Sequence, residues 1–380
     1  MDFVATTTRG AEEVLVDELR ELGLDPTAGR GAVTFSGPLE HGYRACLWSR
    51  VASRVLLTLK RFDVHSDRDL YTAVRSVAWQ RHLGPDQTLA VDYVGGSDVI
   101  RNSRYGALKV KDAVCDRLRD ETGRRPDVEL HRPDLRLNVH QRGDHATLAI
   151  DLSGEALHLR GGRTAGVAPL RETLAAACLR LAGWKGDRPF ADPFAGSGTL
   201  VIEAAEMALG VAPGLRRQRW GFSGWKQHDQ QTWNRLRDEA KEVRTSELPP
   251  MLVSELDRNV LDHARRNLAA RGLLDRVTTL SADARELAPR SEPGMMVCNP
   301  PYGERLGEVE DLAPAYRDLG DNLRRQWLGW DCWILTVLPL AKRLGLRSER
   351  RIPIHNGPID CRLVHVPIAE QAPTGARPRR

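Results

Sequence analysis

Residues 192–200 have the sequence Asp-Pro-Phe-Ala-Gly-Ser-Gly-Thr-Leu, and this stretch decides the fold of the second half of the chain. It joins a short predicted strand to a predicted helix over 198–209. Gly196 and Gly198 allow a sharp turn and a close approach of a ligand to the backbone, and free amides at a helix start can hold an anionic group. A dinucleotide site would need a small residue where Val201 stands, and a P-loop would need Gly-Lys-Ser/Thr. NAD and ATP are therefore poor ligands for this loop.

Acidic residues follow the next two predicted strands along the chain. Ligands of an open parallel sheet bind beyond the carboxyl ends of its strands, at the switch point. Glu255 could there accept both ribose hydroxyls of a nucleoside, and Asp257 is a second candidate that could equally cap the following helix. Asp283, which precedes Ala284, could accept a hydrogen bond from an adenine amino group.

A further motif at 299–303, Asn-Pro-Pro-Tyr-Gly, follows a strand predicted over 295–298. Its two prolines fix the backbone and remove two donors, so we expect their carbonyl oxygens to point outward beside the Asn299 amide oxygen. Such acceptors can bind both hydrogens of an exocyclic amine and localise its lone pair for attack on a methyl group. Tyr302 would supply a face on which a flipped base can stack. Positioning and preorganised dipoles suffice for this chemistry, without a metal or a strong base.

Strand and helix patterns alternate from residue 170 onward, which predicts an α/β domain with a parallel sheet, closed by an antiparallel hairpin over 351–368. The first 50 residues predict a small α+β unit, and residues from about 60 to 155 a second one. The Gly-rich stretch 160–166 predicts a linker. Residues 211–250 are an insertion rich in Trp and Arg, and we expect its aromatic residues to form core rather than to stack on bases.

The composition is that of a globular protein: of 380 residues, 41% are hydrophobic and 28% charged, which excludes disordered and collagenous classes. No apolar run approaches the length of a membrane span, and the first residues lack a signal-peptide pattern. Six scattered cysteines form no Cys-x-x-Cys pair, so we expect buried, reduced thiols and a cytoplasmic location. The net charge of +5 is concentrated at 101–125, 216–219 and 377–380, which favours a polyanionic partner.

Taken in order, the motifs resemble those of class I S-adenosylmethionine-dependent methyltransferases that act on a planar amino group. Further strings resemble the THUMP-domain large-subunit rRNA guanine-N2 methyltransferases, and together they cover residues from about 3 to 365. In the best-known members this module is the N-terminal half of a bifunctional enzyme, whose second half methylates another guanine at N7. The strings lie at 8–13, 48–54, 100–107, 151–154, 169–177, 212–215, 220–225 and 356–361.

The resemblance implies a class I Rossmann-like methyltransferase domain over 161–370, preceded by α+β ferredoxin-like (1–58) and THUMP (59–160) domains and followed by a basic tail (371–380). The implied cofactor is S-adenosylmethionine, and the implied product is N2-methylguanine in 23S rRNA near the peptidyl-transferase region. The implied partners are 23S rRNA or a large-subunit precursor, and a separate guanine-N7 methyltransferase. Neither a membrane nor a metal is implied.

The resemblance also assigns residues. The implied cofactor-binding residues are Asp192, Phe194, Gly196, Ser197, Gly198, Thr199, Glu255, Asp257, Asp283, Ala284 and Asn299. The implied catalytic residues, which would hold the target guanine, are Asn299, Pro300, Pro301 and Tyr302. The implied RNA-binding residues are Arg101, Asn102, Arg104, Lys109, Lys111, Arg216 and Arg217. Two departures are mild: the family has Met-Cys at 194–195 and Asp at 255.

Other targets fit the same acceptor motif. A tRNA guanine, adenine-N6 or cytosine-N4 of DNA, or a protein glutamine would use the same physics, and only the N-terminal domains and the long strings argue against them. A second class of function is a non-catalytic RNA-binding factor of ribosome assembly that retains the fold. Failure to bind S-adenosylmethionine would favour that alternative.

Overall fold

The computed structural model describes residues 1–160, 170–243, 245–303 and 306–369. Most of the predicted linker and the predicted basic tail lie outside these residues. The chain forms two compact units. The N-terminal unit comprises residues 1–7, 15–160 and 212–242, and the C-terminal unit comprises 8–14, 161–211 and 243–380.

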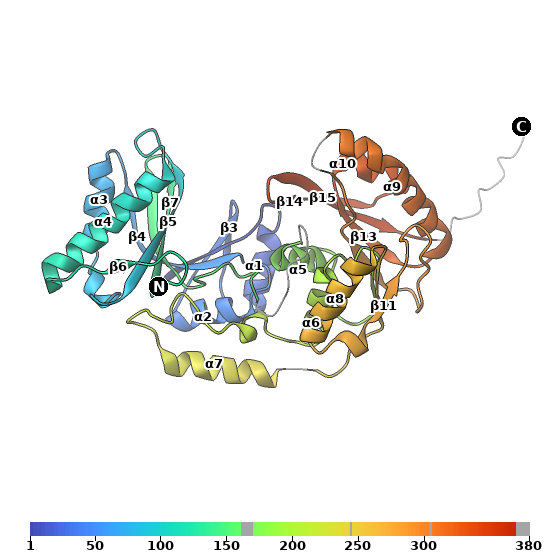
Figure 1. Ribbon diagram of the computed structural model, residues 1–380, viewed down its shortest axis with the longest axis horizontal. Helices are drawn as coiled ribbons and strands as arrows, with labels where there is room; N and C mark the ends of the chain where they lie inside the picture. Colours follow the sequence, from blue (N-terminus) through green and yellow to red (C-terminus); the bar gives the residue numbers. More distant parts are fainter. Residues whose placement is uncertain (161–169, 244, 304–305, 370–380) are drawn as a thin grey trace, which may run out of the picture. The chain divides into compact units, whose positions relative to one another are not determined.

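The N-terminal unit is built on one eight-stranded sheet with the order β2-β3-β1-β4-β8-β7-β5-β6 (Figure 1). β4 pairs antiparallel with β1 through its first residues and with β8 along the rest of its length. This strand therefore runs across the predicted domain boundary at 58/59 and belongs to the sheets of both predicted domains. The strands are β1 (Asp2–Thr6), β2 (Thr27–Gly29), β3 (Ala32–Ser36), β4 (Arg54–Asp63), β5 (Thr88–Gly96), β6 (Asp127–Val128), β7 (Leu135–Arg142) and β8 (His145–Asp151).

The N-terminal unit has four helices and one short 3-10 helix before residue 160, and the limits of the longest are set by its caps. They are α1 (Glu12–Glu21), α2 (Leu39–Trp48), α3 (Asp67–Arg75), the short η1 (Trp79–Arg81) and α4 (Ser103–Thr122). α4 begins earlier than its apolar spacing indicates, because the Asn102 side chain accepts hydrogen bonds from the Arg104 and Tyr105 amides. It ends at Gly123, whose φ of +75° suits a residue without a Cβ atom.

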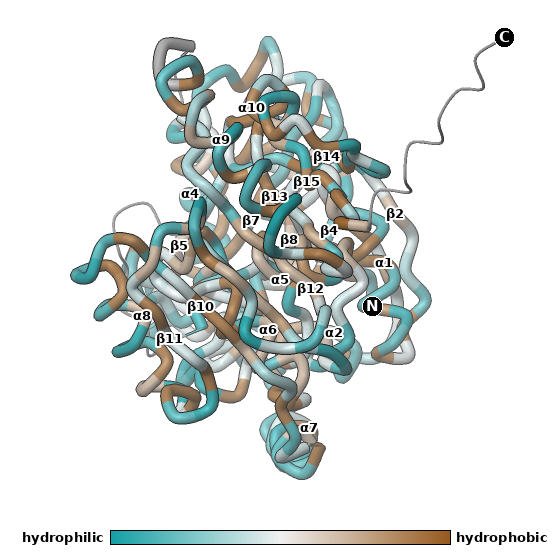
Figure 2. The backbone as a smooth tube through the Cα atoms, turned by 90° about the vertical axis from the view of Figure 1, so that its right-hand side faces the viewer, coloured by the Kyte–Doolittle hydropathy of each residue, from teal (hydrophilic) through white to brown (hydrophobic). Residues whose placement is uncertain are grey.

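The Trp-rich insertion, with η2 (Pro213–Arg216) and α7 (Gln230–Glu242), packs in the N-terminal unit. α7 is mostly hydrophilic and buries three residues, among them Trp233 (Figure 2). Trp220, Phe222 and Trp225 are 4%, 0% and 3% exposed, and the Phe222 ring lies 4.6 Å from that of Tyr43 on α2. The expectation that these aromatics form core is confirmed, and the core they join is that of the N-terminal unit.

The C-terminal unit contains a seven-stranded sheet with the order β11-β10-β9-β12-β13-β15-β14. Its first five strands are parallel, and β14 and β15 close it as an antiparallel hairpin, so the predicted α/β architecture is confirmed. The strands are β9 (Phe190–Asp192), β10 (Met251–Glu255), β11 (Thr278–Ser281), β12 (Met295–Cys298), β13 (Asp331–Thr336), β14 (Arg350–Asn356) and β15 (Ile359–Pro367). The helices are α5 (Glu172–Leu181), α6 (Thr199–Ala208), α8 (Arg258–Ala270), η3 (Leu274–Arg276), α9 (Leu306–Gln326) and α10 (Leu338–Arg343).

The strand order places a switch point between β9 and β12. β9 pairs with β10 on one side and with β12 on the other, and the chain reaches these neighbours through connections that run in opposite directions across the sheet. In open α/β sheets, ligands bind outside the carboxyl ends of the strands at this point. The motifs that follow β9, β10, β11 and β12 therefore face one region of the unit.

An early segment of the chain is built into the C-terminal unit. The Thr8 hydroxyl donates to the His355 carbonyl at 2.7 Å, and the His355 amide donates to the Arg9 carbonyl at 3.0 Å. Gly10 has a φ of +91°, and a Cβ atom added there would lie 2.1 Å from the Pro353 carbonyl oxygen. Only glycine fits this close backbone approach.

All six cysteines are buried and have free thiols, which confirms the expected packing role. Among the described residues, no helix has the length and apolarity required to cross a membrane.

Candidate active site and RNA-binding surface

The turn between β9 and α6 is shaped by two glycines, as the sequence predicts. Gly196 and Gly198 have φ angles of +51° and +81°. The Ala195 amide donates to the Ser254 carbonyl of β10 at 2.9 Å, which ties the turn to the neighbouring strand. A Cβ atom added to Gly196 would meet nothing within 4 Å, so the space beside this residue is open to a ligand.

Asp192, the last residue of β9, carries an unused acceptor. Its side chain is 1% exposed, and its Oδ1 accepts a hydrogen bond from the Phe194 amide at 3.1 Å. Its Oδ2 is buried and has no hydrogen-bond partner in the described part of the chain. Burial, with a smaller contribution from the charge of Glu255, raises the pKa of Asp192 to about 7. Such a carboxylate is suited to a cationic or hydrogen-bond-donating ligand.

The carboxylate of Glu255 is held at the end of β10 by backbone amides. It accepts from Gly196 at 3.0 Å, from Leu256 at 2.9 Å and from Asp257 at 3.3 Å. This network joins the glycine turn to the acidic strand end. Asp257 itself caps α8, because its Oδ1 accepts from the Asn259 amide at 2.8 Å. The structure thus shows the capping alternative for Asp257, and a contact with cofactor stays a prediction.

Predicted cofactor-binding residues of the turn, and Asp283 after β11, have partners in the protein. The Asn267 side chain donates to the Ser197 carbonyl at 2.9 Å, and the Ser197 and Thr199 hydroxyl oxygens lie 3.4 Å apart. Asp283 is paired with Arg285, whose Nη2 lies 2.5 Å from its Oδ2, and this side-chain hydrogen bond lowers the pKa of Asp283. An adenine amino group would have to share the Asp283 carboxylate with Arg285.

A cavity of about 270 Å³ lies at the carboxyl ends of these strands. It brings together predicted residues from all four motifs and adds a wall from α9, which the sequence analysis did not anticipate. The cavity is lined by Pro193, Phe194, Glu255, Leu256, Ala282, Asp283, Ala284, Arg285, Pro300, Pro301, Leu312, Ala315, Tyr316 and Leu319. Leu256 is 64% exposed. The spacing of the α9 residues looks like that of ordinary core, so it carries no signal of a ligand.

The loop after β12 keeps one of its predicted acceptors free. The Asn299 Oδ1 is buried without a hydrogen-bond partner among the described residues, as expected for an acceptor reserved for a substrate. The Pro301 carbonyl, however, accepts from the Tyr316 hydroxyl at 3.2 Å. The expectation that both proline carbonyls point outward is therefore wrong for Pro301.

Tyr302 is mostly covered by the protein. It is 8% exposed, and its Oη accepts from the Asn356 side-chain nitrogen at 2.6 Å. Stacking of a flipped base on this ring stays a prediction, and it requires one ring face to be uncovered.

The predicted RNA-binding residues of the N-terminal unit divide into exposed and engaged groups. Arg101 and Arg104 are exposed, and Arg101 donates from Nε to the Asp98 carbonyl. Lys109 lies 2.9 Å from an Asp67 oxygen, and Lys111 lies 2.8 Å from an Asp112 oxygen. Asn102 caps α4, and Arg216 is exposed on η2. These surface positions remain predictions as phosphate contacts.

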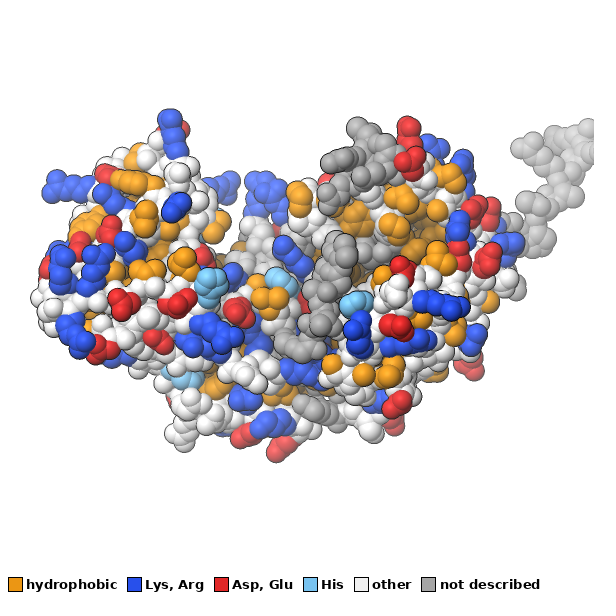
Figure 3. Space-filling model, viewed as in Figure 1, with side chains coloured by type: hydrophobic (Ala, Val, Ile, Leu, Met, Phe, Trp, Pro, Cys, Tyr) orange, Lys and Arg blue, Asp and Glu red, His pale blue; other side chains and the backbone are white. Residues whose placement is uncertain are grey.

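A groove of about 690 Å³ runs along β5 beside α4. Its lining includes the cations Arg104 and Lys111 and the apolar Leu108, which is 47% exposed. It also includes Asn138, which is 7% exposed. Figure 3 shows hydrophobic side chains and cations side by side on this part of the molecule. Such a surface suits a single-stranded polyanion.

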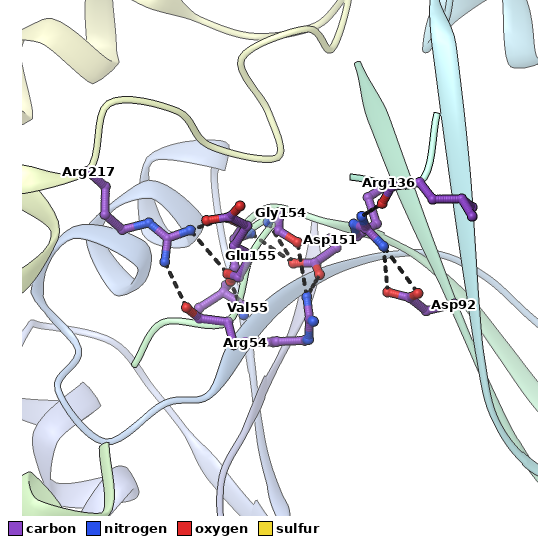
Figure 4. Close-up of polar contacts among 11 residues, drawn as sticks. Arg54, Val55, Asp92, Arg136, Asp151, Gly154, Glu155 and Arg217 are labelled. Atoms are coloured by element: carbon purple, nitrogen blue, oxygen red, sulfur yellow. Dashed lines mark hydrogen bonds and ion pairs between the residues drawn. The ribbon is translucent and has the colours of Figure 1, made fainter. Parts of the chain in front are cut away.

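Arg217 must be removed from the predicted RNA-binding set. It is 7% exposed, and its two terminal nitrogens donate to backbone carbonyls of residues 153, 155, 156 and 159, three of them within 3.1 Å (Figure 4). The guanidinium carbon also lies 4.7 Å from the Trp220 ring centroid. Both terminal nitrogens are thus used within the fold. Nearby, Arg54 forms an ion pair with the fully buried Asp151, so a second arginine of this region is also used within the fold (Figure 4).

No three His, Cys, Asp or Glu side chains gather as metal ligands in residues 1–160, 170–243, 245–303 and 306–369. The strand order, the glycine turn, the acidic strand ends and the Asn-Pro-Pro-Tyr loop together define a class: a Rossmann-like methyltransferase domain, here preceded by α+β domains.

Family comparisons identify the particular family. The model described as "RMKL-like, methyltransferase domain" matches residues 160–365, more than half of the chain, so the chain belongs to this methyltransferase family. The "RlmL ferredoxin-like domain" matches residues 2–56, and the THUMP domain matches 64–151. The resemblance drawn from the sequence is confirmed. The finer domain limits remain those proposed above.

Curated relatives carry the name "Ribosomal RNA large subunit methyltransferase K/L". The chain is 44% identical to the one from Methylococcus capsulatus, over 97% of this chain and 52% of the relative. It is 45% identical to the one from Syntrophotalea carbinolica, over 98% of this chain and 54% of the relative. The chain therefore spans about half the length of the curated relatives it matches.

Solved structures with the same fold cover nearly the whole chain. SMU.472, described as a putative methyltransferase complexed with SAH, superimposes with a TM-score of 0.87 at 28% identity and covers 98% of both chains. A predicted N6-adenine-specific DNA methylase from Listeria monocytogenes superimposes with a TM-score of 0.84 at 30% identity, over 96% of this chain and 95% of that one.

Proposed function

We propose that the chain transfers a methyl group from S-adenosylmethionine to the exocyclic N2 amine of one guanine in 23S rRNA. The observation that carries the proposal is the Asn299 Oδ1, a buried acceptor without a partner in the described chain. Asn299 directly precedes Pro300, which lines the cavity at the carboxyl ends of the strands. A buried amide oxygen left without a donor costs stability unless a ligand supplies one.

The residues present fit the proposed cofactor. The unpartnered Asp192 Oδ2 would accept from its ammonium group, and Glu255 would accept from its ribose hydroxyls. The open space at Gly196 gives room beside the turn. Phe194 and Leu256 supply apolar walls of the cavity. When bound, S-adenosylmethionine supplies the electrophilic methyl group, and its sulfur takes the bonding pair as S-adenosylhomocysteine forms.

The chain's contribution to the reaction is positioning and electrostatics. Asn299 Oδ1 and the Pro300 carbonyl would each accept one hydrogen of the target amine, so that the nitrogen lone pair is localised and aimed. The amine nitrogen held by these acceptors would take up the methyl group that the cofactor supplies and would then release one proton to water. Neither acceptor needs to act as a strong base, because an alkylated amine of this kind is acidic. Preorganised acceptors and proximity account for such catalysis.

The RNA assignment rests on the N-terminal unit and on the relatives' names. Cations such as Arg104 beside the apolar groove would contact phosphates and set the register of the RNA, while the catalytic loop selects the amine. We propose 23S rRNA or a large-subunit precursor as the substrate, with the reaction in the cytoplasm. A guanine-N7 methyltransferase, in a separate chain or elsewhere in a longer one, is a proposed partner.

A second candidate is adenine-N6 methylation of DNA. A structural relative has that description, and an adenine amine would meet the same two acceptors. The discriminating experiment incubates the protein with labelled S-adenosylmethionine and three substrates: unmodified 23S rRNA, tRNA and duplex DNA.

Label at one guanine of 23S rRNA, recovered as N2-methylguanine, supports the proposal. Label in tRNA or DNA would support methyltransferase activity and refute 23S rRNA as the substrate. Absence of S-adenosylmethionine binding would favour the non-catalytic assembly factor. Asn299→Ala, assayed in parallel, shows whether the label depends on this loop.

A further inference from the structure

Two side chains outside the Asn-Pro-Pro-Tyr motif fix one of its peptide units. Tyr316 of α9 is 2% exposed, and its hydroxyl lies 3.2 Å from the Pro301 carbonyl oxygen. The same hydroxyl lies 2.7 Å from the Thr336 hydroxyl at the end of β13, and Thr336 is fully buried. The target-base loop is therefore tied to a helix and a strand that lie far from it in the sequence.

The number of protons sets the direction of these hydrogen bonds. A tyrosine hydroxyl has one hydrogen, and the Pro301 carbonyl can only accept, so Tyr316 donates to Pro301. Thr336 must then donate to the Tyr316 oxygen. Burial raises the pKa of Tyr316, which keeps its hydroxyl protonated. The chain of donors thus runs from Thr336 through Tyr316 to the Pro301 carbonyl.

This arrangement decides which acceptors of the loop can reach a substrate. An amine with two hydrogens needs two acceptors, and the candidates that the motif offers are the Asn299 Oδ1 and the carbonyls of Pro300 and Pro301. Tyr316 already donates to the third, and this hydrogen bond orients the peptide unit that bears it. The first is without a partner in the described chain. The pair formed by Asn299 and Pro300 is then the one that remains for the amine.

We infer that Tyr316 is a positioning residue of the methyl transfer. By donating to the Pro301 carbonyl, it holds the loop in the one orientation in which the Asn299 and Pro300 acceptors face the amine. The inference rests on the proposed function and adds a residue to it. Without the Tyr316 hydroxyl, the 301 carbonyl would compete for the amine, and the nucleophile could bind in an unproductive register.

The Tyr316 ring also lines the cavity proposed for the cofactor, next to Leu312, Ala315 and Leu319 of the same helix. Removal of the whole side chain would disturb that cavity. Tyr316→Phe keeps the ring and deletes only the donor, so it separates the hydrogen bond from the cavity wall.

For Tyr316→Phe we expect kcat to fall by up to about 100-fold, the loss that a misplacement of a reacting group by about 1 Å can cause. The dissociation constant of S-adenosylhomocysteine and the KM for RNA should stay near their wild-type values. Thr336→Val should lower kcat less, because Tyr316 keeps its own donor. The double variant should be no slower than Tyr316→Phe, since both substitutions act through one hydrogen bond.

Tyr71→Phe is the matched control: it deletes a tyrosine hydroxyl that donates to Asp116 at 2.8 Å in the N-terminal unit, and its kcat should be unchanged. A wild-type kcat for Tyr316→Phe would overturn the inference, and so would a loss of S-adenosylhomocysteine affinity as large as the loss of kcat. The comparison holds for whichever of rRNA, tRNA or DNA the wild type methylates. An error in the proposed substrate would change which nucleic acid is methylated, whereas an error in the role of Tyr316 would change the ratio of the variant kcat to the wild-type kcat.

Discussion

Asp192→Asn is expected to stabilise the cofactor-free protein while it weakens the cofactor site. The carboxyl is 1% exposed, and burial raises its pKa from 3.8 to about 7. At a pH between these two pKa values, Asp192 of the folded protein keeps a proton that the same residue of the unfolded chain has lost. The free energy of unfolding of the wild type therefore decreases as the pH rises through this window, and the full cost of the buried charge is present above pH 7.

The size of the effect follows from that shift. Each pKa unit corresponds to about 1.4 kcal/mol, so a shift of about three units sets an upper bound of about 4 kcal/mol. An asparagine cannot ionise and escapes this cost. The variant should accordingly match the wild type at about pH 4 and exceed it by up to about 4 kcal/mol at about pH 8. Its amide cannot pair with an ammonium group as a carboxylate does, so cofactor affinity should fall about tenfold or more.

Two measurements test this reasoning. Urea unfolding of both proteins at acid and alkaline pH gives the difference in stability, and calorimetric titration with S-adenosylhomocysteine gives the affinity. The wild-type affinity should weaken about tenfold per pH unit below pH 7, and that of the variant should not vary with pH. Asp17→Asn, at an exposed carboxylate of α1, is the control. A variant that is no more stable at pH 8 and binds with wild-type affinity would refute the assignment of Asp192.

Three further predictions address other parts of the chain. Asn299→Ala should abolish methyl transfer and leave S-adenosylhomocysteine affinity nearly intact; a parallel loss of affinity in calorimetry would contradict its role toward the amine. Gly10→Ala should lower the free energy of unfolding by about 2–4 kcal/mol in urea, because its Cβ would clash with the Pro353 carbonyl at a positive φ. Arg217→Ala should destabilise by at least about 1–3 kcal/mol, since it leaves buried carbonyls without donors. Arg104→Gln should instead keep stability and weaken RNA binding in a filter assay; equal effects of both arginine substitutions on RNA affinity in folded protein would contradict this division.

The fold of the C-terminal unit was largely predictable, because the sequence patterns that indicate its strands and turns are local. Each strand is a short apolar run, and each functional group follows its strand directly, so one rule of sheet topology places the motifs together. The glycine turn, Glu255 and Asn299 all follow from this rule. Leu256 was missed although it adjoins Glu255, because an exposed leucine has no distinct sequence signal.

Other features depend on contacts between distant parts of the chain. Arg217 looks like part of a basic cluster in the sequence, but its partners are carbonyls some 60 residues earlier. The same holds for Tyr316, whose spacing on α9 is that of a core residue and whose hydroxyl partners lie 15 and 20 residues away. The charge of a residue and its spacing in the sequence indicate what type of surface or core it belongs to. The roles of Arg217 and Tyr316 depend instead on which backbone carbonyl lies next to the side chain in the folded chain.

Two buried acceptors at the carboxyl ends of neighbouring strands bear on the function together. Asp192 Oδ2 and Asn299 Oδ1 are both buried without partners in the described chain. Asp192 ends β9 and Asn299 follows β12, which are neighbouring parallel strands. A buried acceptor without a donor costs about 1–3 kcal/mol, so a fold optimised only for stability would not place two of them one strand apart. Their cost is recovered only by a ligand that donates at both positions, and an ammonium-bearing cofactor next to a substrate amine supplies those donors from two molecules. The proposed reaction needs these same two molecules side by side, so both unpaired acceptors lie where the reactants would meet.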